Sequence, residues 1–548
     1  MKRKINQINQ IKIAGFLTSA IVCFGFNFGV LVTAQSVKDQ RVIEKPTPTP
    51  TPTPTVTPML TAMPTPVSVQ TVADLQSQIR SRLARPELWR GQVGVKIVAL
   101  DTGKTVFEQN AEKYFMPASN MKSFTVAAAL EKLSPDFRFM TSVYAPAMPD
   151  ANGTIRGDLT IYGRGDVSFS TAFNDGDYYK GLDVLAEKIV QAGVKRIEGN
   201  LVGDESYFSG NPIPASWEWD DLQWYYGAEI SALGVNDNAV DLSVKPSSVN
   251  QPCFVQTLPI NTIVKIVNRC TTSASDTKRD IQVLKNLNQN VLEITGTMPP
   301  GDKGFSGSVS VSHPAELFVG TLRGLLLKKG VMITGQNKII GTKDKAVSAV
   351  ASSVVTPIEI AKLESPPLGL VAAKTMKPSQ NLYTETILWT LGEQVGDRTD
   401  PKKISAERGL SVVQNFLLQA GIPSDSVIQW DGSGLSRHNL ITPNSVVQLY
   451  SYMARSRYAQ VWRDALTIGS VDGTLRNRFK GTSAAGNVRG KTGTIDQVSA
   501  LSGYVNTAAG ERLVFSILVN GVVDSKVRQA AIDDIVVALS NFKGKMNQ

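Results

Sequence analysis

Histidine and cysteine are scarce in this sequence, which has two histidines and three cysteines in 548 residues. The two histidines, His313 and His438, are far apart in the chain. A histidine-built metal site or a Ser-His-Asp triad would therefore depend on a single histidine. No zinc-ligand spacing occurs, nor any concentrated basic stripe with aromatic residues, so nucleic-acid binding has little support. We expect no metal, no other cofactor and no nucleic-acid partner.

The three cysteines consist of one near the N-terminus and two in the middle of the chain. Cys23 lies in an N-terminal apolar segment, whereas Cys253 and Cys270 flank a stretch that reads as two short strands around a Pro-Ile-Asn turn. An even pair in an exported protein favours a disulfide. Two buried thiols are the alternative.

The N-terminal segment indicates export. Residues 1–34 begin with lysine and arginine, continue as a mostly apolar run over 13–34, and end in the small residues Val-Thr-Ala. This pattern is typical of a cleaved signal peptide. The apolar run is also long enough to remain as an uncleaved membrane anchor. Residues 35–69 are rich in proline and threonine, which favours an extended linker without a packed core.

Three short motifs carry the chemistry, and they occur in a fixed order. Ser119 and Lys122 form S-x-x-K, Ser379 and Asn381 form S-x-N, and Lys491 opens K-T-G. This ordered set is typical of serine acyl-transfer enzymes of the penicillin-binding and β-lactamase type. Each motif alone is weak, because S-x-x-K and S-x-N also recur in polar or terminal stretches. The alternative is the coincidence of a capping serine, a loop serine and a turn glycine.

The spacing of Ser119 and Lys122 suits nucleophilic catalysis. A serine hydroxyl needs an adjacent base, and residues at i and i+3 of a helix lie on one face. Lys122 can accept the proton only if its pKa falls, through burial or through a second cation such as Lys491. Two β-rich runs, 498–505 and 513–520, predict a hairpin after the K-T-G motif. We expect the N–H groups of Ser119 and Thr494 to form the oxyanion hole.

With these residues in view, the chain from about residue 70 to 540 resembles class C, low-molecular-mass penicillin-binding proteins. The resemblance is to the D-alanyl-D-alanine carboxypeptidase/endopeptidase type, known as penicillin-binding protein four. It extends beyond the three motifs to the following stretches: Trp217–Leu222, Tyr225–Asn236, Ser365–Leu368, Asn381–Glu385 and Asp431–Arg437.

The resemblance implies a role for each motif residue. Ser119 would be acylated, Lys122 would take its proton, and Ser379 would relay a proton to the leaving amine. Asn381 would hold the substrate backbone, and Lys491 would supply charge. Thr492 and Thr494 would bind the terminal carboxylate of the substrate.

One departure from the family pattern concerns Asp166. The family often has Gly-Asp-Pro where this chain has Gly165-Asp166-Val167, so the resemblance alone does not assign Asp166 a substrate-binding role. We still expect acidic groups near turns of the inserted region, such as Asp166, to meet a free amine on the stem peptide of peptidoglycan.

The chain is too long for one compact core, so several domains are expected. The 260 positions between Ser119 and Ser379 require an insertion. We predict an α+β catalytic domain from residues 70–138 and 349–548, with one antiparallel sheet shared by both chain ends and flanked by helices. Residues 139–348 would form a β-rich inserted region. Helices are predicted at 72–85, 124–133, 181–192, 314–329, 381–395, 405–420, 443–455 and 529–542.

Three functions compete at this level. The first is a serine carboxypeptidase that cleaves D-Ala-D-Ala and, because the insertion would stand over the cleft, an endopeptidase for peptide cross-links. Peptidoglycan stem peptides would be substrates and β-lactams covalent inhibitors, on the periplasmic or cell-wall side of the membrane. A class A β-lactamase would also need a water-activating glutamate, and no E-x-x-L-N segment is present. A non-catalytic wall-binding protein would be expected to lose Ser119 or Lys122.

Overall fold

The computed structural model describes residues 71–342 and 356–546. The predicted export segment (1–34) and the proline- and threonine-rich linker (35–69) lie outside the described residues. Within the described part of the chain, no helix combines the length and the apolar character needed to cross a bilayer.

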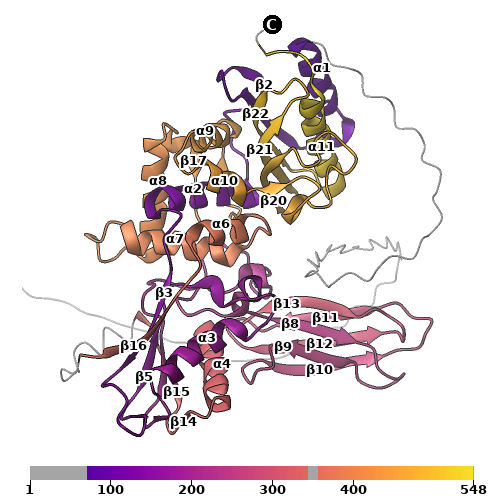
Figure 1. The fold of residues 1–548 in the computed structure, drawn as a ribbon. Coiled ribbons are helices and arrows are strands. Elements are labelled where there is room, and N and C mark those ends of the chain that lie inside the picture. Colours follow the sequence, from indigo (N-terminus) through magenta and orange to yellow (C-terminus); the bar gives the residue numbers. More distant parts are fainter. Residues whose placement is uncertain (1–70, 343–355, 547–548) are drawn as a thin grey trace, which may run out of the picture. The chain divides into compact units, whose positions relative to one another are not determined.

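A six-stranded antiparallel sheet joins the two ends of the chain, as predicted (Figure 1). Its strand order is β19-β20-β21-β22-β1-β2, so the pairing of β22 with β1 connects the C-terminal strands to the N-terminal hairpin. The predicted hairpin β21–β22 is present, and β1 and β2 form a second hairpin. The strands are β1 (Gln92–Ala99), β2 (Thr105–Gln109), β19 (Thr467–Ile468), β20 (Arg489–Ile495), β21 (Val498–Asn506) and β22 (Arg512–Asn520).

Alternation along β22 buries both faces of this sheet. Phe515 and Ile517 pack with Ile532 of α11 in one hydrophobic cluster, whereas Val514 and Leu518 belong to the cluster on the opposite face. Successive side chains of a strand point to opposite faces, so a continuously apolar strand is the expected sequence for a sheet covered on both sides. The outer helices of the first cluster are α1 (Val72–Leu83) and α11 (Ser525–Asn541).

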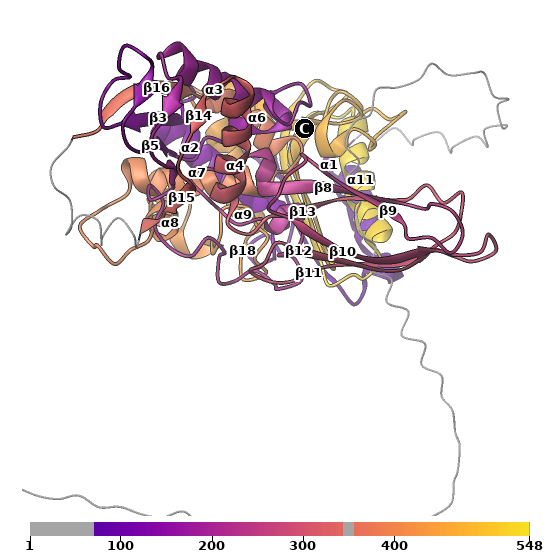
Figure 2. The same cartoon turned by 90° about the horizontal axis from the view of Figure 1, so that it is seen from below.

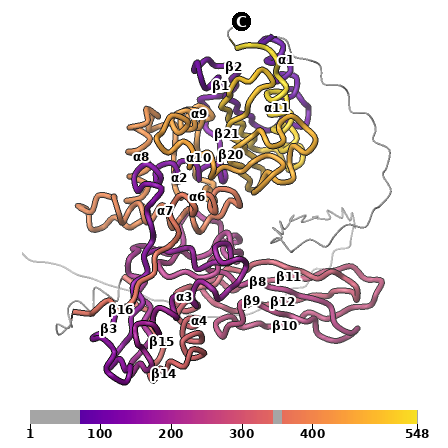
Figure 3. The backbone as a smooth tube through the Cα atoms, viewed as in Figure 1, coloured from indigo at the N-terminus to yellow at the C-terminus, as the bar shows by residue number. Residues whose placement is uncertain are grey.

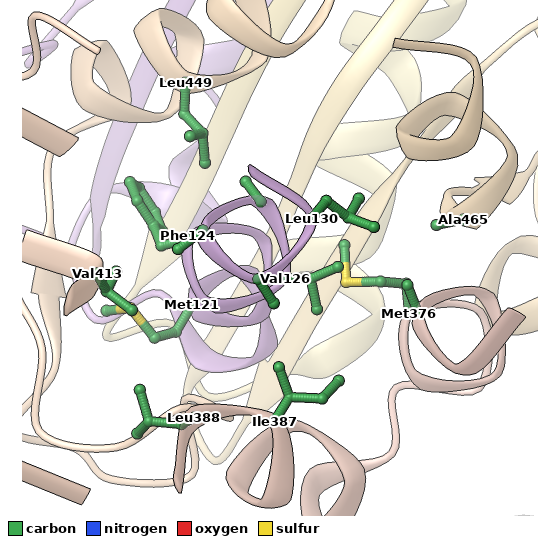
Figure 4. Close-up of a cluster of buried hydrophobic side chains, with 14 of the residues drawn as sticks. Met121, Phe124, Val126, Leu130, Met376, Ile387, Leu388, Val413, Leu449 and Ala465 are labelled. Carbon is green, nitrogen blue, oxygen red and sulfur yellow. The ribbon is translucent and has the colours of Figure 1, made fainter. Parts of the chain in front are cut away.

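Helix α2 (Lys122–Leu133) lies in the middle of the second cluster and is buried over most of its length. Figure 4 shows Phe124, Val126 and Leu130 of this helix surrounded by side chains that include Met376 and Ile387. The surrounding helices are α6 (Leu368–Met376), α7 (Asn381–Val395), α8 (Ser405–Gln419), α9 (Pro443–Met453) and α10 (Ala459–Ala465), with the short hairpin β17 (Val427–Ile428) and β18 (Leu440–Ile441). Every helix predicted from the sequence is present, and α6 and α10 were not predicted.

The inserted region begins with a five-stranded mixed sheet of order β15-β7-β5-β3-β16. Strand β16 follows the undescribed residues 343–355 and pairs with β3, so this sheet extends to Glu364 rather than ending at the predicted boundary of 349. Its elements are β3 (Met140–Ala145), β5 (Leu159–Tyr162), β7 (Leu201–Asp204), β15 (Asn337–Ile340) and β16 (Ile358–Glu364), with α3 (Lys180–Gln191), α4 (Pro314–Lys328) and the small sheet β4 (Thr154–Ile155), β6 (Arg196–Ile197) and β14 (Met332–Ile333).

A second part of the insertion consists of two three-stranded sheets, β13-β8-β9 and β10-β12-β11 (Figure 2). Cys253 lies just before β9 and Cys270 lies within β10, and the two are joined by a disulfide. The disulfide therefore joins the start of β9 to β10 of the other sheet, and Figure 3 shows the course of the two strands. The strands are β8 (Ala239–Lys245), β9 (Phe254–Leu258), β10 (Lys265–Thr272), β11 (Asp280–Lys285), β12 (Val291–Met298) and β13 (Phe305–Ser310).

Candidate active site

Ser119 and Lys122 lie side by side at the start of the buried helix. Ser119 belongs to the 3-10 turn η2 (Ala118–Met121), and Lys122 is the first residue of α2. The Lys122 Nζ atom donates a hydrogen bond of 3.0 Å to the Ser119 Oγ atom. The i, i+3 spacing thus produces the contact that proton transfer requires.

Lys122 is wholly buried and uses three acceptors, which matches the three donors of an ammonium group. Besides Ser119, its Nζ atom donates to Asn381 Oδ1 at 2.6 Å and to the carbonyl oxygen of Ser433 at 2.7 Å. Burial lowers the pKa of Lys122 to about 7, against the opposing effect of the nearby carboxylates of Asp431 and Glu385. A substantial fraction of this amine is therefore neutral near pH 7.

This pKa predicts a pH dependence for acylation. A base must be unprotonated to accept a proton, so activity should fall as pH drops below the pKa of Lys122. We expect the acylation rate constant with a β-lactam to fall nearly tenfold per unit below about pH 7 and to level off above it. Stopped-flow acylation between about pH 5 and about pH 9 measures this profile. A flat profile across that range would rule out Lys122 as the base.

A second lysine–serine pair faces the first. The Lys491 Nζ atom donates to Ser379 Oγ at 2.8 Å and to the carbonyl oxygen of Thr492 at 2.9 Å. Burial lowers the pKa of Lys491 well below its ordinary value, and the positive charge of Lys122 lowers it further. From the sequence, Lys491 is one possible cause of a low pKa of Lys122. The structure attributes that low pKa to burial, because Lys122 packs inside the helical core.

The backbone of Ser379 is held in an unusual conformation. Its φ angle is +67°, in the left-handed region that costs an ordinary residue roughly 1–2 kcal/mol. Two residues later, Asn381 begins α7, and its Nδ2 atom donates to the carbonyl oxygen of Tyr226 at 2.9 Å. Such strain is found mainly where a side chain must be aimed, and here Ser379 is aimed at Lys491.

Strand β20 approaches the nucleophile turn closely because it contains a glycine. A Cβ atom at Gly493 would lie 2.4 Å from the carbonyl oxygen of Pro117, which no larger residue could occupy without displacement. The Asn120 Nδ2 atom fixes the approach with a 3.1 Å bond to the carbonyl oxygen of Lys491. On either side of this glycine, Thr492 donates to Thr474 Oγ1 at 2.7 Å and Thr494 is half-buried.

A buried loop behind Lys122 supplies a contact that the sequence argument missed. The carbonyl of Ser433 accepts from Lys122, and the Glu385 carboxylate accepts the N–H groups of Gly432 at 3.0 Å and Ser433 at 2.7 Å. Burial, and next the charge of Asp431, raise the pKa of Glu385 to about 8. Only the resemblance of Asn381–Glu385 and Asp431–Arg437 to family segments pointed to these positions.

Asp431 holds the shape of this loop. Its buried carboxylate accepts four hydrogen bonds: from the N–H groups of Gly434 (2.7 Å) and Ser436 (2.7 Å), from Asn439 Nδ2 (2.8 Å) and from Trp217 Nε1 (2.9 Å). Gly434 has a φ of +84°, and a Cβ atom there would lie 1.9 Å from the carbonyl oxygen of Ala118. The loop is therefore fitted directly against the nucleophile turn.

The inserted region also reaches the site. Besides Tyr226 and Trp217, Asp237 accepts hydrogen bonds from Tyr383 Oη at 2.6 Å and Gln380 Nε2 at 3.2 Å. Gln380 is the middle residue of the S-x-N motif. Residues on both sides of the domain boundary thus hold the catalytic side chains in place.

Asp166 is buried rather than exposed on a turn, with 3% of its surface accessible. Its Oδ1 atom accepts from the Ser168 N–H at 2.8 Å, whereas no partner is found for Oδ2 among the described residues. Burial raises its pKa to about 6. Asp166 lines a small pocket with Asp237, Tyr383 and Leu382, the last being the residue after Asn381. Its role in substrate binding stays a prediction.

The geometry supports serine acyl transfer. A nucleophile touches an amine of low pKa, a second hydroxyl–amine pair stands opposite, and a strand borders both. In residues 71–342 and 356–546, no three histidine, cysteine or acidic side chains gather where they could hold a metal ion.

Comparisons with known proteins agree with this chemistry. Residues 75–542 match the model of the D-Ala-D-Ala carboxypeptidase 3 (S13) family. The chain is 30% identical over 485 residues to a D-alanyl-D-alanine carboxypeptidase of Actinomadura sp. strain R39, covering 86% of each protein. It is 25% identical over 450 residues to the D-alanyl-D-alanine carboxypeptidase DacB of Haemophilus influenzae, covering 80% of this chain and 88% of the relative.

Among solved structures, the chain is similar to penicillin binding protein 4 of Haemophilus influenzae, with a TM-score of 0.70 and 24% identity over 86% of this chain and 98% of that one. A structure of that protein complexed with a β-lactam gives a TM-score of 0.67 and 22% identity over the same shares. This likeness shows the fold, an α+β penicillin-binding architecture.

Proposed function

The chain belongs to the D-Ala-D-Ala carboxypeptidase 3 (S13) family, and from this premise we propose that it is a serine D-alanyl-D-alanine carboxypeptidase of peptidoglycan stem peptides. The observation that carries the proposal is the 3.0 Å contact between Ser119 and the buried amine of Lys122, whose pKa is lowered to about 7. The contact argues against a protein that only binds the cell wall, because such a protein needs no activated nucleophile.

The reaction begins with attack of Ser119 Oγ on the carbonyl of the penultimate D-Ala while Lys122 takes the hydroxyl proton. The N–H groups of Ser119 and Thr494 stabilise the oxyanion. Collapse of the intermediate breaks the C–N bond, and Ser379, bonded to Lys491, passes a proton to the leaving D-Ala amine. Water then hydrolyses the ester, which returns Ser119 to its free form.

Substrate orientation comes from the neighbouring groups. Thr492 and Thr494, beside the charge of Lys491, bind the terminal carboxylate, and Asn381 holds the peptide backbone. Asp166 meets a free amine on the stem peptide from its pocket beside α7, which would compensate for the unpartnered Oδ2 atom.

Labelling by penicillin tests the nucleophile. A β-lactam presents an acyl group whose leaving amine stays tethered, so the ester on Ser119 should persist. We expect a fluorescent penicillin to label the protein, and peptide mapping to place the adduct on Ser119. Ser119→Ala should abolish labelling, whereas Ser275→Ala, in the exposed S-x-x-K match of the inserted region, should leave it unchanged. An adduct on another residue would refute the assignment.

We propose endopeptidase activity on cross-links as a second reaction of the same site. Cleavage of a cross-link requires room for a second peptide beyond the scissile bond, and Tyr226 and Asp237 of the inserted region border the site on one side. Incubation with cross-linked muropeptides, with products identified by mass, measures both reactions. Release of D-Ala without any loss of dimers would restrict the enzyme to carboxypeptidase activity.

The location follows from the substrate. We propose that the chain is exported and faces the cell wall, with residues 13–34 either removed with the signal peptide or retained as an anchor. Mass determination of the N-terminus of the exported protein separates these two outcomes.

A further inference from the structure

Two large aromatic side chains are exposed beside the active site. Trp219 has 70% of its surface accessible and Trp430 has 53%. Their segments are held together, because Trp217 Nε1 donates to Asp431 Oδ2 at 2.9 Å and Arg437 pairs with Glu218 at 3.0 Å. Exposed tryptophans on adjoining segments are typical of binding surfaces, since each leaves a large apolar face in water.

Trp430 is also held rigidly. Its backbone N–H donates to Asn439 Oδ1 at 2.7 Å, and Asn439 Nδ2 donates in turn to Asp431 at 2.8 Å. Its ring lies against the exposed imidazole of His438, with centroids 5.0 Å apart and an interplanar angle of 38°. We call Trp219, Trp430 and His438 the aromatic platform. A ring that is already ordered loses little entropy when it binds a ligand.

The platform segment contacts the residue that follows the C-terminal end of β20. The Arg437 Nη1 atom donates to the carbonyl oxygen of Asp496 at 3.0 Å, which joins the platform segment to the residue that follows the strand. Asp496 is two positions beyond Thr494, on the side away from Lys491. The platform therefore neighbours the Thr494 end of β20.

The proposed reaction fixes the direction in which the substrate lies along β20. The leaving D-Ala carboxylate lies toward Lys491 and the reacting carbonyl lies at Thr494, so the remaining stem peptide extends toward Asp496. Four extended residues span about 13 Å. The two strand positions from Thr494 to Asp496 account for about 7 Å of this length. The rest of the stem peptide is long enough to pass over Arg437. The sugar end of the stem thus arrives at the platform.

We propose that the aromatic platform binds the N-acetylated sugars of the glycan strand from which the stem peptide branches. This inference rests on the proposed function. The flat C–H face of a pyranose packs on an aromatic ring, and the indole N–H remains available for a hydroxyl or acetyl oxygen. Arg437 and Glu218, on the platform segments, pair with each other, which suits a ligand whose sugar rings are uncharged.

The test compares two substrates that differ only in the sugar. Release of D-Ala is measured from a free pentapeptide and from the same pentapeptide on its N-acetylated disaccharide. We expect the wild type to have the lower KM for the glycan-linked substrate. Trp430→Ala should lower kcat/KM for that substrate about tenfold, mainly through KM, which corresponds to ~1.4 kcal/mol. The value for the free pentapeptide should stay within about twofold.

Controls separate a binding role from a structural one. Trp89 precedes β1 and is 79% exposed, so Trp89→Ala should leave kcat/KM unchanged for both substrates. Penicillin labelling of each variant reports an intact site. Equal loss on both substrates, or no glycan preference in the wild type, would overturn the proposal.

A binding measurement keeps the two proposals distinguishable. The Ser119→Ala variant, with and without Trp430→Ala, is sedimented with glycan strands stripped of their peptides. Binding that is lost with Trp430 supports the platform even if D-Ala release were absent in the wild type. Binding that does not depend on Trp430 refutes the platform and leaves the carboxypeptidase proposal intact.

Discussion

Lys122→Ala is expected to lower the rate constant for acylation by penicillin by roughly 10³-fold, because general-base catalysis contributes about 10² to 10⁴. In the structure, Lys122 is the amine in contact with Ser119 Oγ, and Lys491 is directed at Ser379 instead. The fold should survive, since removing a buried amine also removes the cost of its desolvation. Time-resolved labelling gives the rate, and circular dichroism checks the fold.

Lys132→Ala provides the matched control, because Lys132 lies on the same helix and its amine contacts the exposed side chain of Gln419. Its acylation rate should equal that of the wild type. If Lys122→Ala retained a rate within about tenfold of wild type, the barrier would have changed by only ~1.4 kcal/mol and another base would have to operate.

Asp431→Ala is expected to have the largest effect on stability. Four donors lose their acceptor, and each buried donor left unpaired costs about 1–3 kcal/mol, so the free energy of unfolding should fall by at least about 4 kcal/mol. Acylation should slow as well, because the loop carries the Ser433 carbonyl that orients Lys122. Urea unfolding followed by tryptophan fluorescence measures the first effect and penicillin labelling the second.

Asp425→Ala is the comparison for this prediction, since Asp425 is exposed on the short 3-10 turn before β17. Its removal should change the free energy of unfolding by no more than about 0.5 kcal/mol. Equal midpoints for the Asp431 and Asp425 variants would mean that the loop keeps its shape without the carboxylate.

The sequence predicted those parts of the fold and site that depend on local periodicity. The contact of Ser119 with Lys122 follows from helical spacing, and the shared sheet follows from apolar runs at both chain ends. Strand β16 was missed because it is an edge strand without a fully buried residue, so no continuous apolar run marks it. Its partner β3 lies far upstream, and no local pattern records such a pairing.

The missing parts of the site are those made by backbone atoms and by tertiary contact. Ser433 contributes its carbonyl, which every residue has, so its side chain gives no signal of the role. Asp431 and Glu385 act through N–H groups of the loop and touch no part of Ser119 in the described contacts. The burial of Asp166 likewise depends on residues of α7 that are distant in sequence.

The amide of Asn381 has a consequence for how the catalytic base is held. Its oxygen accepts from Lys122, while its nitrogen is turned outward to the carbonyl of Tyr226 in the inserted region. One side chain therefore joins the catalytic base to the inserted region. Both partners precede Asn381 in the chain, so the amide is fixed from both sides only when the inserted region is docked against α7. The position of the catalytic base is thereby coupled to a region that contains none of the three motifs.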